Sequence, residues 1–364
     1  MSPAAPPLRG GTRKQTVPKH RAWAPIPLCC MEEVLKNIMR FPIRLPDNPL
    51  RLLNAYVIRG EAGGRNLLID TGLPRRESRE DLLTGMKDLG LTPENTDVFI
   101  THMHLDHIGN APLLKRLGYR VLISRPDYEM FCRGERTMWR DAIARIKNEG
   151  TPVSLIREAL GESQDLVFMP THLEPDTLED GDTLAYGGYV FTCVLTSGHT
   201  IGHMCLYEKQ EKILFLGDHV LFDISPNISI WEGFEDPLGS YMESLRAIGE
   251  LEVRTVLPGH RRAEASRLRE RAEEIRAHHR QRLKEIEAQL AAHPRLTGFD
   301  LTRQLRWASQ GDGWDRFPTD QKYFAVCETL AHLDHLVLTG RVLQEENGEG
   351  QFTYRLAPDK EEEP

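Results

Sequence analysis

The sequence predicts a mixed α/β fold in which short, buried strands carry polar side chains to one edge of a sheet. Short apolar runs alternate with glycine-rich turns, and amphipathic helical stretches separate them. Several runs end within three residues of a histidine or aspartate, as at residues 98–107 and 255–260. Strand, polar loop and helix follow one another in the order that brings ligands to the end of a sheet.

The chain of 364 residues is long enough for two domains, and its 40% apolar residues are typical of a globular protein. Its net charge of −8 argues against general nucleic-acid binding, which usually needs a basic surface. No apolar run approaches the roughly 18 residues of a membrane span, so we expect no membrane association. The cysteines form no CxxC pair, which fits a reducing cytoplasm, and we expect Cys193 and Cys205 to be small core residues.

Both ends of the chain differ from the rest. Residues 1–30 are rich in proline and basic residues and lack acidic ones, which predicts a disordered basic tail rather than a secretory signal. Residues 31–262 form the expected catalytic domain, and residues 359–364 form an acidic tail. In the first half of this domain, we expect strands at 52–58, 66–70 and 97–100, and helices at 75–89 and 111–117.

Residues 125–165 interrupt the pattern as a helical insertion. They predict two helices, the second at about 153–160. The insertion is either a packed element with a solvated charged face or a lid over the histidines and aspartates at the strand ends. As a lid, its aromatic residues Tyr128 and Trp139 would meet an acyl chain, and Arg140 a carboxylate or phosphate.

After the insertion, the chain returns to strands and then becomes helical. Residues 263–293 predict a charged connecting helix, which could also form a homodimer contact. Residues 294–358 predict helices followed by a β-hairpin, the order of a winged-helix domain. We expect strands at 182–186, 189–195, 204–207, 212–216 and 255–257, and a helix at 238–250.

Four histidines near the C-terminus carry weaker signals. His278 and His279 lie on the charged helix, and we expect both to be solvated. His332 and His335 flank an aspartate and resemble a metal pair only superficially.

Seven potential metal ligands follow predicted strands, and this number exceeds the four that one tetrahedral zinc takes. Seven ligands suit two metals that share a carboxylate. The alternative is that residues 102–107 are only a polar loop rich in histidine, but that alternative does not explain the further ligands at the ends of later strands. A metal pair about 3.5–4 Å apart can hold a bridging hydroxide and polarise the group that it attacks. The seven residues are His102, His104, Asp106, His107, His199, Asp218 and His260.

The motifs at these positions resemble the metallo-β-lactamase superfamily over about residues 42–260. They are His-x-His-x-Asp-His at 102–107, Ser-Gly-His-Thr-x-Gly-His at 197–203, Gly-Asp at 217–218 and Pro-Gly-His at 258–260, with Leu-Ile-Asp-Thr-Gly at 68–72 as the first landmark. The Gly-Asp-His run, Ser-Pro-Asn at 225–227 and the tail resemble the glyoxalase-II-like, or hydroxyacylglutathione-hydrolase-like, branch with a C-terminal winged helix.

The resemblance implies an αββα sandwich with two metal ions, expected to be zinc with manganese or iron as alternatives, at one edge of the sheets. Asp70 would orient a ligand, or else cap a turn, and His203 would be a structural histidine beside the site. His219 would either hydrogen-bond substrate or pack. The implied ligands are His102, His104 and His199 for the first metal, Asp106, His107 and His260 for the second, and Asp218 as the bridge.

These residues predict a metal-dependent hydrolase of a small-molecule thioester, ester or lactone. The bridging hydroxide would attack the carbonyl, and Asp106 would relay a proton to the leaving group. An endoribonuclease is one alternative, but from residue 295 to the end the chain has eight basic against thirteen acidic residues, the wrong sign for phosphate binding. A mononuclear-iron persulfide dioxygenase is another, since iron can use two histidines and one carboxylate.

Overall fold

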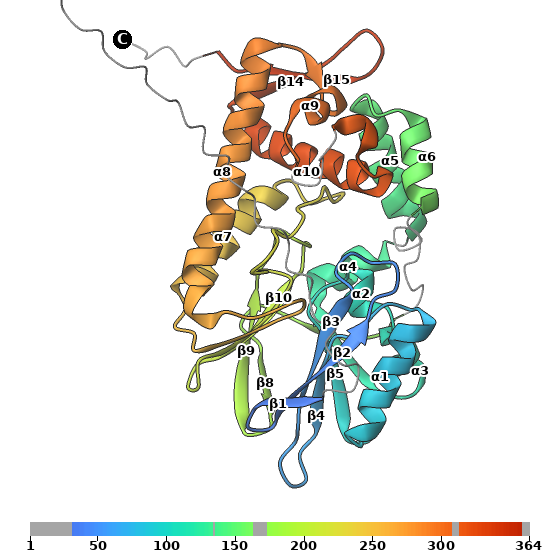
Figure 1. The fold of residues 1–364 in the computed structure, drawn as a ribbon, viewed down its shortest axis with the longest axis vertical. Coiled ribbons are helices and arrows are strands. Elements are labelled where there is room, and N and C mark those ends of the chain that lie inside the picture. Colours follow the sequence, from blue (N-terminus) through green and yellow to red (C-terminus); the bar gives the residue numbers. More distant parts are fainter. Residues whose placement is uncertain (1–30, 134, 163–172, 308–312, 359–364) are drawn as a thin grey trace, which may run out of the picture. The chain divides into compact units, whose positions relative to one another are not determined.

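The computed structural model describes residues 31–133, 135–162, 173–307 and 313–358. The predicted tails at 1–30 and 359–364 lie outside the described residues. Two sheets face each other, and helices cover the outer face of each sheet (Figure 1). The predicted mixed α/β fold of αββα layers is therefore confirmed.

The first sheet has seven strands, which lie side by side in the order of the chain. Its first four strands pair antiparallel, and the pairs from β4 to β7 are parallel. Every residue of β5 is buried, as expected for a strand covered on both faces. The strands are β1 (Glu32–Leu35), β2 (Ile38–Arg44), β3 (Leu52–Ile58), β4 (Asn66–Ile69), β5 (Thr96–Ile100), β6 (Arg120–Ser124) and β7 (Asp176–Leu178).

The second sheet has five strands in the order β12-β11-β10-β9-β8. Its strands pair antiparallel, except that β12 is parallel to β11. They are β8 (Thr183–Tyr186), β9 (Tyr189–Leu195), β10 (Met204–Glu208), β11 (Ile213–Gly217) and β12 (Thr255–Pro258).

Aromatic and aliphatic side chains from both sheets fill the space between them. The ring of Phe215 lies 5.4 Å from that of Tyr56 in the first sheet and 5.6 Å from that of Phe191 in its own. Cys193 belongs to this core, and Cys205 is buried on the other face of the second sheet. Both cysteines are core residues, as predicted.

Helices cover the two outer faces through apolar stripes. Leu82 and Met86 of α1 (Arg76–Asp88) and Leu114 of α3 (Ala111–Arg116) pack on the first sheet. The second sheet is covered by α7 (Pro237–Glu250), against which the long helix α8 (Leu268–Ala292) packs after a short 3₁₀ turn at Ala265–Arg267. No helix in the described part of the chain is both long and apolar enough to span a membrane.

The insertion contains three helices rather than the two that the sequence predicted. They are α4 (Arg125–Cys132), α5 (Glu135–Asn148) and α6 (Val153–Glu162). The first predicted helix is divided after Cys132, where the sequence contains Gly134, a residue with weak helix propensity. The Ser124 side chain caps α4 by accepting a hydrogen bond from the backbone N–H of Asp127.

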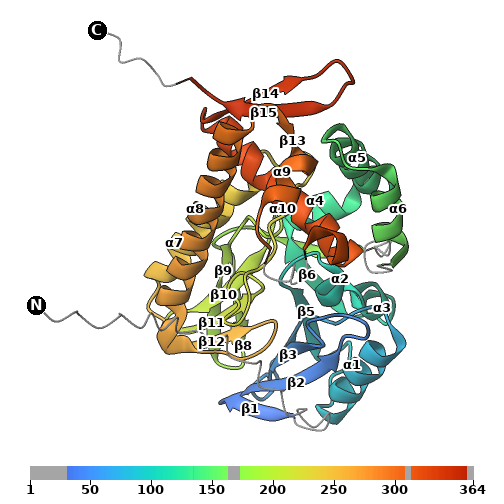
Figure 2. The same ribbon diagram turned by 45° about the horizontal axis from the view of Figure 1, so that its top comes forward.

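The C-terminal region packs against α6, α7 and α8 (Figure 2). It has two helices and a three-stranded sheet of order β13-β15-β14, so the predicted helices and hairpin are present. Its identity as a winged helix stays a prediction. The elements are β13 (Leu296–Thr297), α9 (Gly298–Gln304), a 3₁₀ turn (Trp314–Arg316), α10 (Thr319–Leu338), β14 (Val342–Glu346) and β15 (Phe352–Leu356).

The prediction that His278 and His279 are both solvated is wrong for His279. His278 is exposed, but His279 is only 1% exposed because α10 packs against this part of α8. The high charge of α8 hid a buried stripe that includes Ile275, Leu283 and Ile286.

Candidate metal centre

Polar side chains follow the ends of strands from both sheets and meet at one edge of the sandwich. Asp70 follows β4 and His102 follows β5, and these strands are parallel. In the second sheet Asp218 and His260 follow the parallel strands β11 and β12, and His199 lies in the turn between β9 and β10. Because the parallel pairs end at the same edge, ligands distant in sequence come together.

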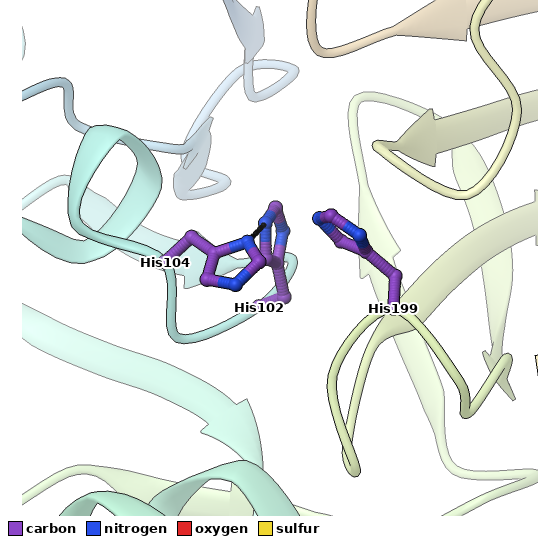
Figure 3. A group of neighbouring side chains, drawn as sticks. All are labelled: His102, His104 and His199. Carbon is purple, nitrogen blue, oxygen red and sulfur yellow. Dashed lines mark hydrogen bonds between the residues drawn. The ribbon is translucent and has the colours of Figure 1, made fainter. Parts of the chain in front are cut away.

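Three histidines form the first group, and their rings converge in Figure 3. One nitrogen each of His102, His104 and His199 lies within 4.8 Å of the others. His102 Nε2 is 3.0 Å from His104 Nδ1. His102 and His104 come from the loop after β5, whereas His199 comes from the second sheet.

Asp106, His107 and His260 form a second group with ligand atoms within 4.8 Å of one another. His107 and Asp106 lie on the short helix α2 (Leu105–Ile108). The Nε2 atoms of His107 and His260 are 3.1 Å apart, and His260 Nε2 is 3.3 Å from Asp106 Oδ2.

The carboxylate of Asp218 lies between the two groups. Its Oδ1 is 3.5 Å from His107 Nε2, and its Oδ2 is 3.4 Å from His260 Nε2 and 4.0 Å from His199 Nε2. The structure therefore brings all seven predicted ligands together, with the Asp218 carboxylate within 4.0 Å of a histidine of each group.

The tautomers of the histidines fit metal binding. His107 Nδ1 donates to Asp70, His260 Nδ1 donates to the carbonyl of Leu52, and His199 Nδ1 donates to the carbonyl of Asn227. When neutral, each ring therefore directs a lone pair at Nε2 toward the centre. His199 Nε2 is buried and has no hydrogen-bond partner among the described residues. Imidazole and carboxylate ligands of this kind suit zinc and similar transition metals.

The two groups differ in their affinity for protons. Burial and neighbouring histidines keep the pKa of His102 well below its ordinary value and lower that of His104 to about 3. Burial also lowers the pKa of His107, but the carboxylates of Asp70, Asp218 and Asp106 outweigh it and raise that pKa well above the ordinary value. The same balance, with Asp218 and Asp106, raises the pKa of His260.

Asp70 and His203 are not in the ligand groups but form hydrogen bonds with two of the candidate ligands. Asp70 Oδ2 lies 2.7 Å from His107 Nδ1, and its carboxylate accepts hydrogen bonds from the backbone N–H and hydroxyl of Thr101. His203 Nε2 accepts a hydrogen bond of 3.1 Å from the backbone N–H of Asp218. A Cβ at Gly217 would lie 2.7 Å from that nitrogen, so this close approach requires glycine.

Asp127 joins two ligand loops and was not singled out in the sequence. Its buried carboxylate accepts hydrogen bonds from the backbone N–H of Met103 at 2.8 Å, the hydroxyl of Thr200 at 2.9 Å and the backbone N–H of Gly202 at 2.6 Å. Met103 lies between two predicted ligands, and Thr200 follows a third. Asp127 shares their sequence signal, because it is an acidic residue shortly after a buried strand.

The chain matches the family model described as the metallo-beta-lactamase superfamily over residues 49–260. The chain belongs to this superfamily. The matched segment contains all seven predicted ligands and the residues that support them.

Two solved structures match nearly the whole chain. A metallo-beta-lactamase family protein of Thermus thermophilus is 29% identical with a TM-score of 0.72, over 89% of this chain and 100% of that one. A beta-lactamase domain protein of Burkholderia ambifaria is 26% identical with a TM-score of 0.76, over 92% of this chain and 97% of that one.

Curated relatives include two named thioesterases. The acyl-coenzyme A thioesterase MBLAC2 of Homo sapiens is 27% identical over 57% of this chain and 72% of its own length. The atrochrysone carboxyl ACP thioesterase of Aspergillus fumigatus is 30% identical, also over 57% of this chain, but this region spans only 50% of that protein.

Of the predicted substrate residues whose side chains the structure describes, Tyr128 and Arg140 lie away from the centre, and His219 directly follows Asp218. Tyr128 packs against the outer core of the first sheet, and Arg140 is exposed and pairs with Asp141. His219 is fully buried, with its ring near those of His203 and Tyr241. The side chain of Trp139 lies outside what the structure describes.

Trp231 is a candidate substrate contact that the sequence did not reveal. Its indole lies 5.9 Å from the His104 ring, between centroids. It also lines a pocket of about 370 Å³ between α5 and α10, together with Ala142, Ile230, Phe234 and Val337 among others. The sequence offered no signal for this residue, because it lies in a loop without periodicity.

Proposed function

We propose that this protein is a metal-dependent hydrolase of a small-molecule thioester, with ester and lactone as related substrates. The observation that carries the proposal is the position of Asp218 within 3.5 Å of His107 and 3.4 Å of His260, and 4.0 Å from His199 of the other group. One carboxylate placed between two sets of ligands suits a dinuclear centre. The thioesterases among the relatives support a thioester substrate.

In this proposal, His102, His104 and His199 hold one zinc ion, Asp106, His107 and His260 hold the other, and Asp218 bridges them. Such ions would supply an activated hydroxide and a Lewis acid for the carbonyl oxygen. Asp106 would relay a proton to the leaving group of the thioester. Burial raises the Asp106 pKa, but His107 and His260 outweigh this effect and lower the pKa to about 2, so its carboxylate is ionised at neutral pH.

Asp70 and His203 act as positioning residues. Asp70 keeps the proton of His107 on Nδ1 and so leaves Nε2 free for a ligand bond. His203 fixes the backbone of Asp218. The resemblance to the glyoxalase-II-like branch adds a hydroxyacyl thioester to the substrates worth testing.

A hydrolysis panel on metal-replete protein tests the proposal. It should contain acyl and hydroxyacyl thioesters, lactones, nitrocefin and RNA, with metal content measured on the same sample. We expect thioester turnover with two zinc or manganese ions bound at the candidate metal centre, and loss of the turnover and of these ions in Asp218→Ala. RNA cleavage would favour the nuclease alternative, and one iron with oxygen consumption would favour the dioxygenase. Thioester hydrolysis by a metal-free Asp218→Ala variant would refute the mechanism.

A further inference from the structure

A second group of potential metal ligands lies between α8 and α10 and shares no residue with the candidate metal centre. One ligand atom each from His278, His279 and Glu328 lies within 4.8 Å of the others. The histidines belong to α8 and the glutamate to α10, and these two helices contact each other. The site therefore joins residues about 50 positions apart.

Hydrogen bonds define the tautomers in this cluster. His332 Nδ1 lies 2.7 Å from the carbonyl of Glu328 and must donate to it, because a carbonyl only accepts. The neutral His332 ring then has a lone pair at Nε2, which accepts the Nδ1–H of His279 at 3.1 Å. His279 therefore carries its own lone pair at Nε2.

This lone pair lacks a donor. His279 is 1% exposed, and its Nε2 has no hydrogen-bond partner among the described residues. Leaving a buried polar atom unsatisfied is costly, so an atom of this kind indicates a missing partner. Metal-bound histidines commonly donate their other N–H to a second group, as His279 does to His332.

The surroundings favour one class of ion. Two imidazoles and one carboxylate suit zinc, cobalt or nickel better than magnesium or calcium, which prefer oxygen ligands. Arg282 lies nearby, and its positive charge opposes any cation at this site, so a bound ion depends on the coordinate bonds of the imidazole nitrogens. Its guanidinium has other partners, since it donates to Glu285 and to the carbonyl of Arg306 and lies 4.4 Å from the centre of the Trp307 ring.

An ion can reach this cluster from the surface. His278 is exposed and lines a pocket of about 290 Å³. Arg282 and Trp307 line the same pocket. Glu328 is half-buried on α10, the helix that contacts α8 at the two histidines.

We propose that a divalent transition-metal ion of the zinc type binds to His278, Glu328 and Nε2 of His279, with His332 orienting the His279 ring. The ion links the long helix α8 to α10 and so stabilises the attachment of the C-terminal region. The proposal does not depend on the hydrolytic function. It adds one ion to whatever the candidate metal centre holds.

Metal stoichiometry tests the proposal on the full chain. The metal-free protein is saturated with Zn²⁺, dialysed and analysed by elemental mass spectrometry. We expect His278→Ala and Glu328→Gln each to contain one zinc fewer than wild type. His293→Ala, which removes an exposed histidine at the end of α8, is the matched control and should retain the wild-type content.

Because the test compares the zinc content of each variant with that of wild type, the number of ions at the candidate metal centre does not affect the result. A Co²⁺ titration should likewise lose one equivalent of visible absorption in His278→Ala, with an unchanged circular dichroism spectrum. Zinc should raise the melting temperature of wild type more than that of His278→Ala. Equal zinc content in wild type and both variants overturns the proposal and leaves a buried water as the partner of His279.

Discussion

The Nε2 atoms of His107 and His260 face each other at 3.1 Å, while each ring donates its Nδ1–H to a different acceptor. When both rings are neutral, two lone pairs oppose each other at this distance, and a shared cation or proton relieves the repulsion. The carboxylates around these rings outweigh burial and raise the pKa of both. In the metal-free protein, this pair therefore binds protons more readily than the group of His102, His104 and His199.

This contrast predicts that the two proposed metal ions leave at different pH values. Protons compete with metal for imidazole nitrogen, so affinity at the group of His107 and His260 falls as pH falls through their raised pKa values. Burial and neighbouring histidines lower the pKa of His104 to about 3, so its group retains metal to lower pH. In His278→Ala, which lacks the ion proposed between α8 and α10, metal content after desalting at a series of pH values should fall in two steps. A single step that removes both ions would contradict this order.

Asp127→Asn should weaken metal binding without removing a ligand. The Asp127 carboxylate accepts three hydrogen bonds. In the variant, the amide nitrogen cannot accept, so it would face a backbone N–H or the Thr200 hydroxyl without forming the present hydrogen bond. Loss of such support typically costs about 10- to 100-fold in metal affinity. Competition with a chromogenic chelator measures this change, and Asp223→Asn at an exposed position is the control. Unchanged affinity would show that Asp127 only stabilises the fold.

Gly259→Ala should disrupt the centre through one methyl group. A Cβ there would lie 2.8 Å from Asp218 Oδ1 and 2.9 Å from His107 Cε1, so the carboxylate must move. We expect at least about a tenfold loss of activity, because catalytic groups tolerate little displacement. Gly348→Ala, whose Cβ would meet no atom within 4 Å, should behave like wild type. Steady-state kinetics of both variants measure this loss, and equal activity of the two variants would contradict the prediction.

Trp231→Ala should affect substrate binding more than metal binding. The indole lies beside His104 and lines the pocket between α5 and α10, but it is not a ligand. We expect kcat/KM for a long-chain thioester to fall about tenfold, because the acyl group would lose an apolar contact. The metal content should stay unchanged. Trp231→Phe should recover part of the loss. Equal losses for long and short acyl chains would argue against an acyl contact.

Tyr354→Phe should destabilise the attachment of the insertion to the C-terminal sheet. The Tyr354 hydroxyl on β15 donates to Glu149, at the end of the insertion helix α5, at 2.7 Å, and both side chains are buried. Removing this donor leaves the carboxylate less satisfied, at a cost of about 1–3 kcal/mol. Urea unfolding measures the loss. Tyr189→Phe, at a more exposed tyrosine that donates to the carbonyl of Lys36, should cost less.

The sequence alone predicted the strands that lead into the candidate centre, most of the long helices and the seven candidate ligands, but it did not predict β1, β2, β6, β7 or β13. Apolar runs that end in histidine or aspartate are local patterns, and strand ends in an α/β fold place such residues at one edge. The same signal was present at Asp127. The break in the insertion was harder to predict, because the apolar spacing continues across Gly134 while helix propensity does not.

Only the tertiary structure decided which polar residues became buried partners. His279 lies on a highly charged helix, and its burial depends on α10, which arrives about 50 residues later. Trp231 meets His104 through a loop whose path no local pattern encodes. Asp218 became the central carboxylate because β11 and β12 end beside the loop that follows β5. Local periodicity specifies strands and their ends, but the packing of sheets and helices determines which ends meet.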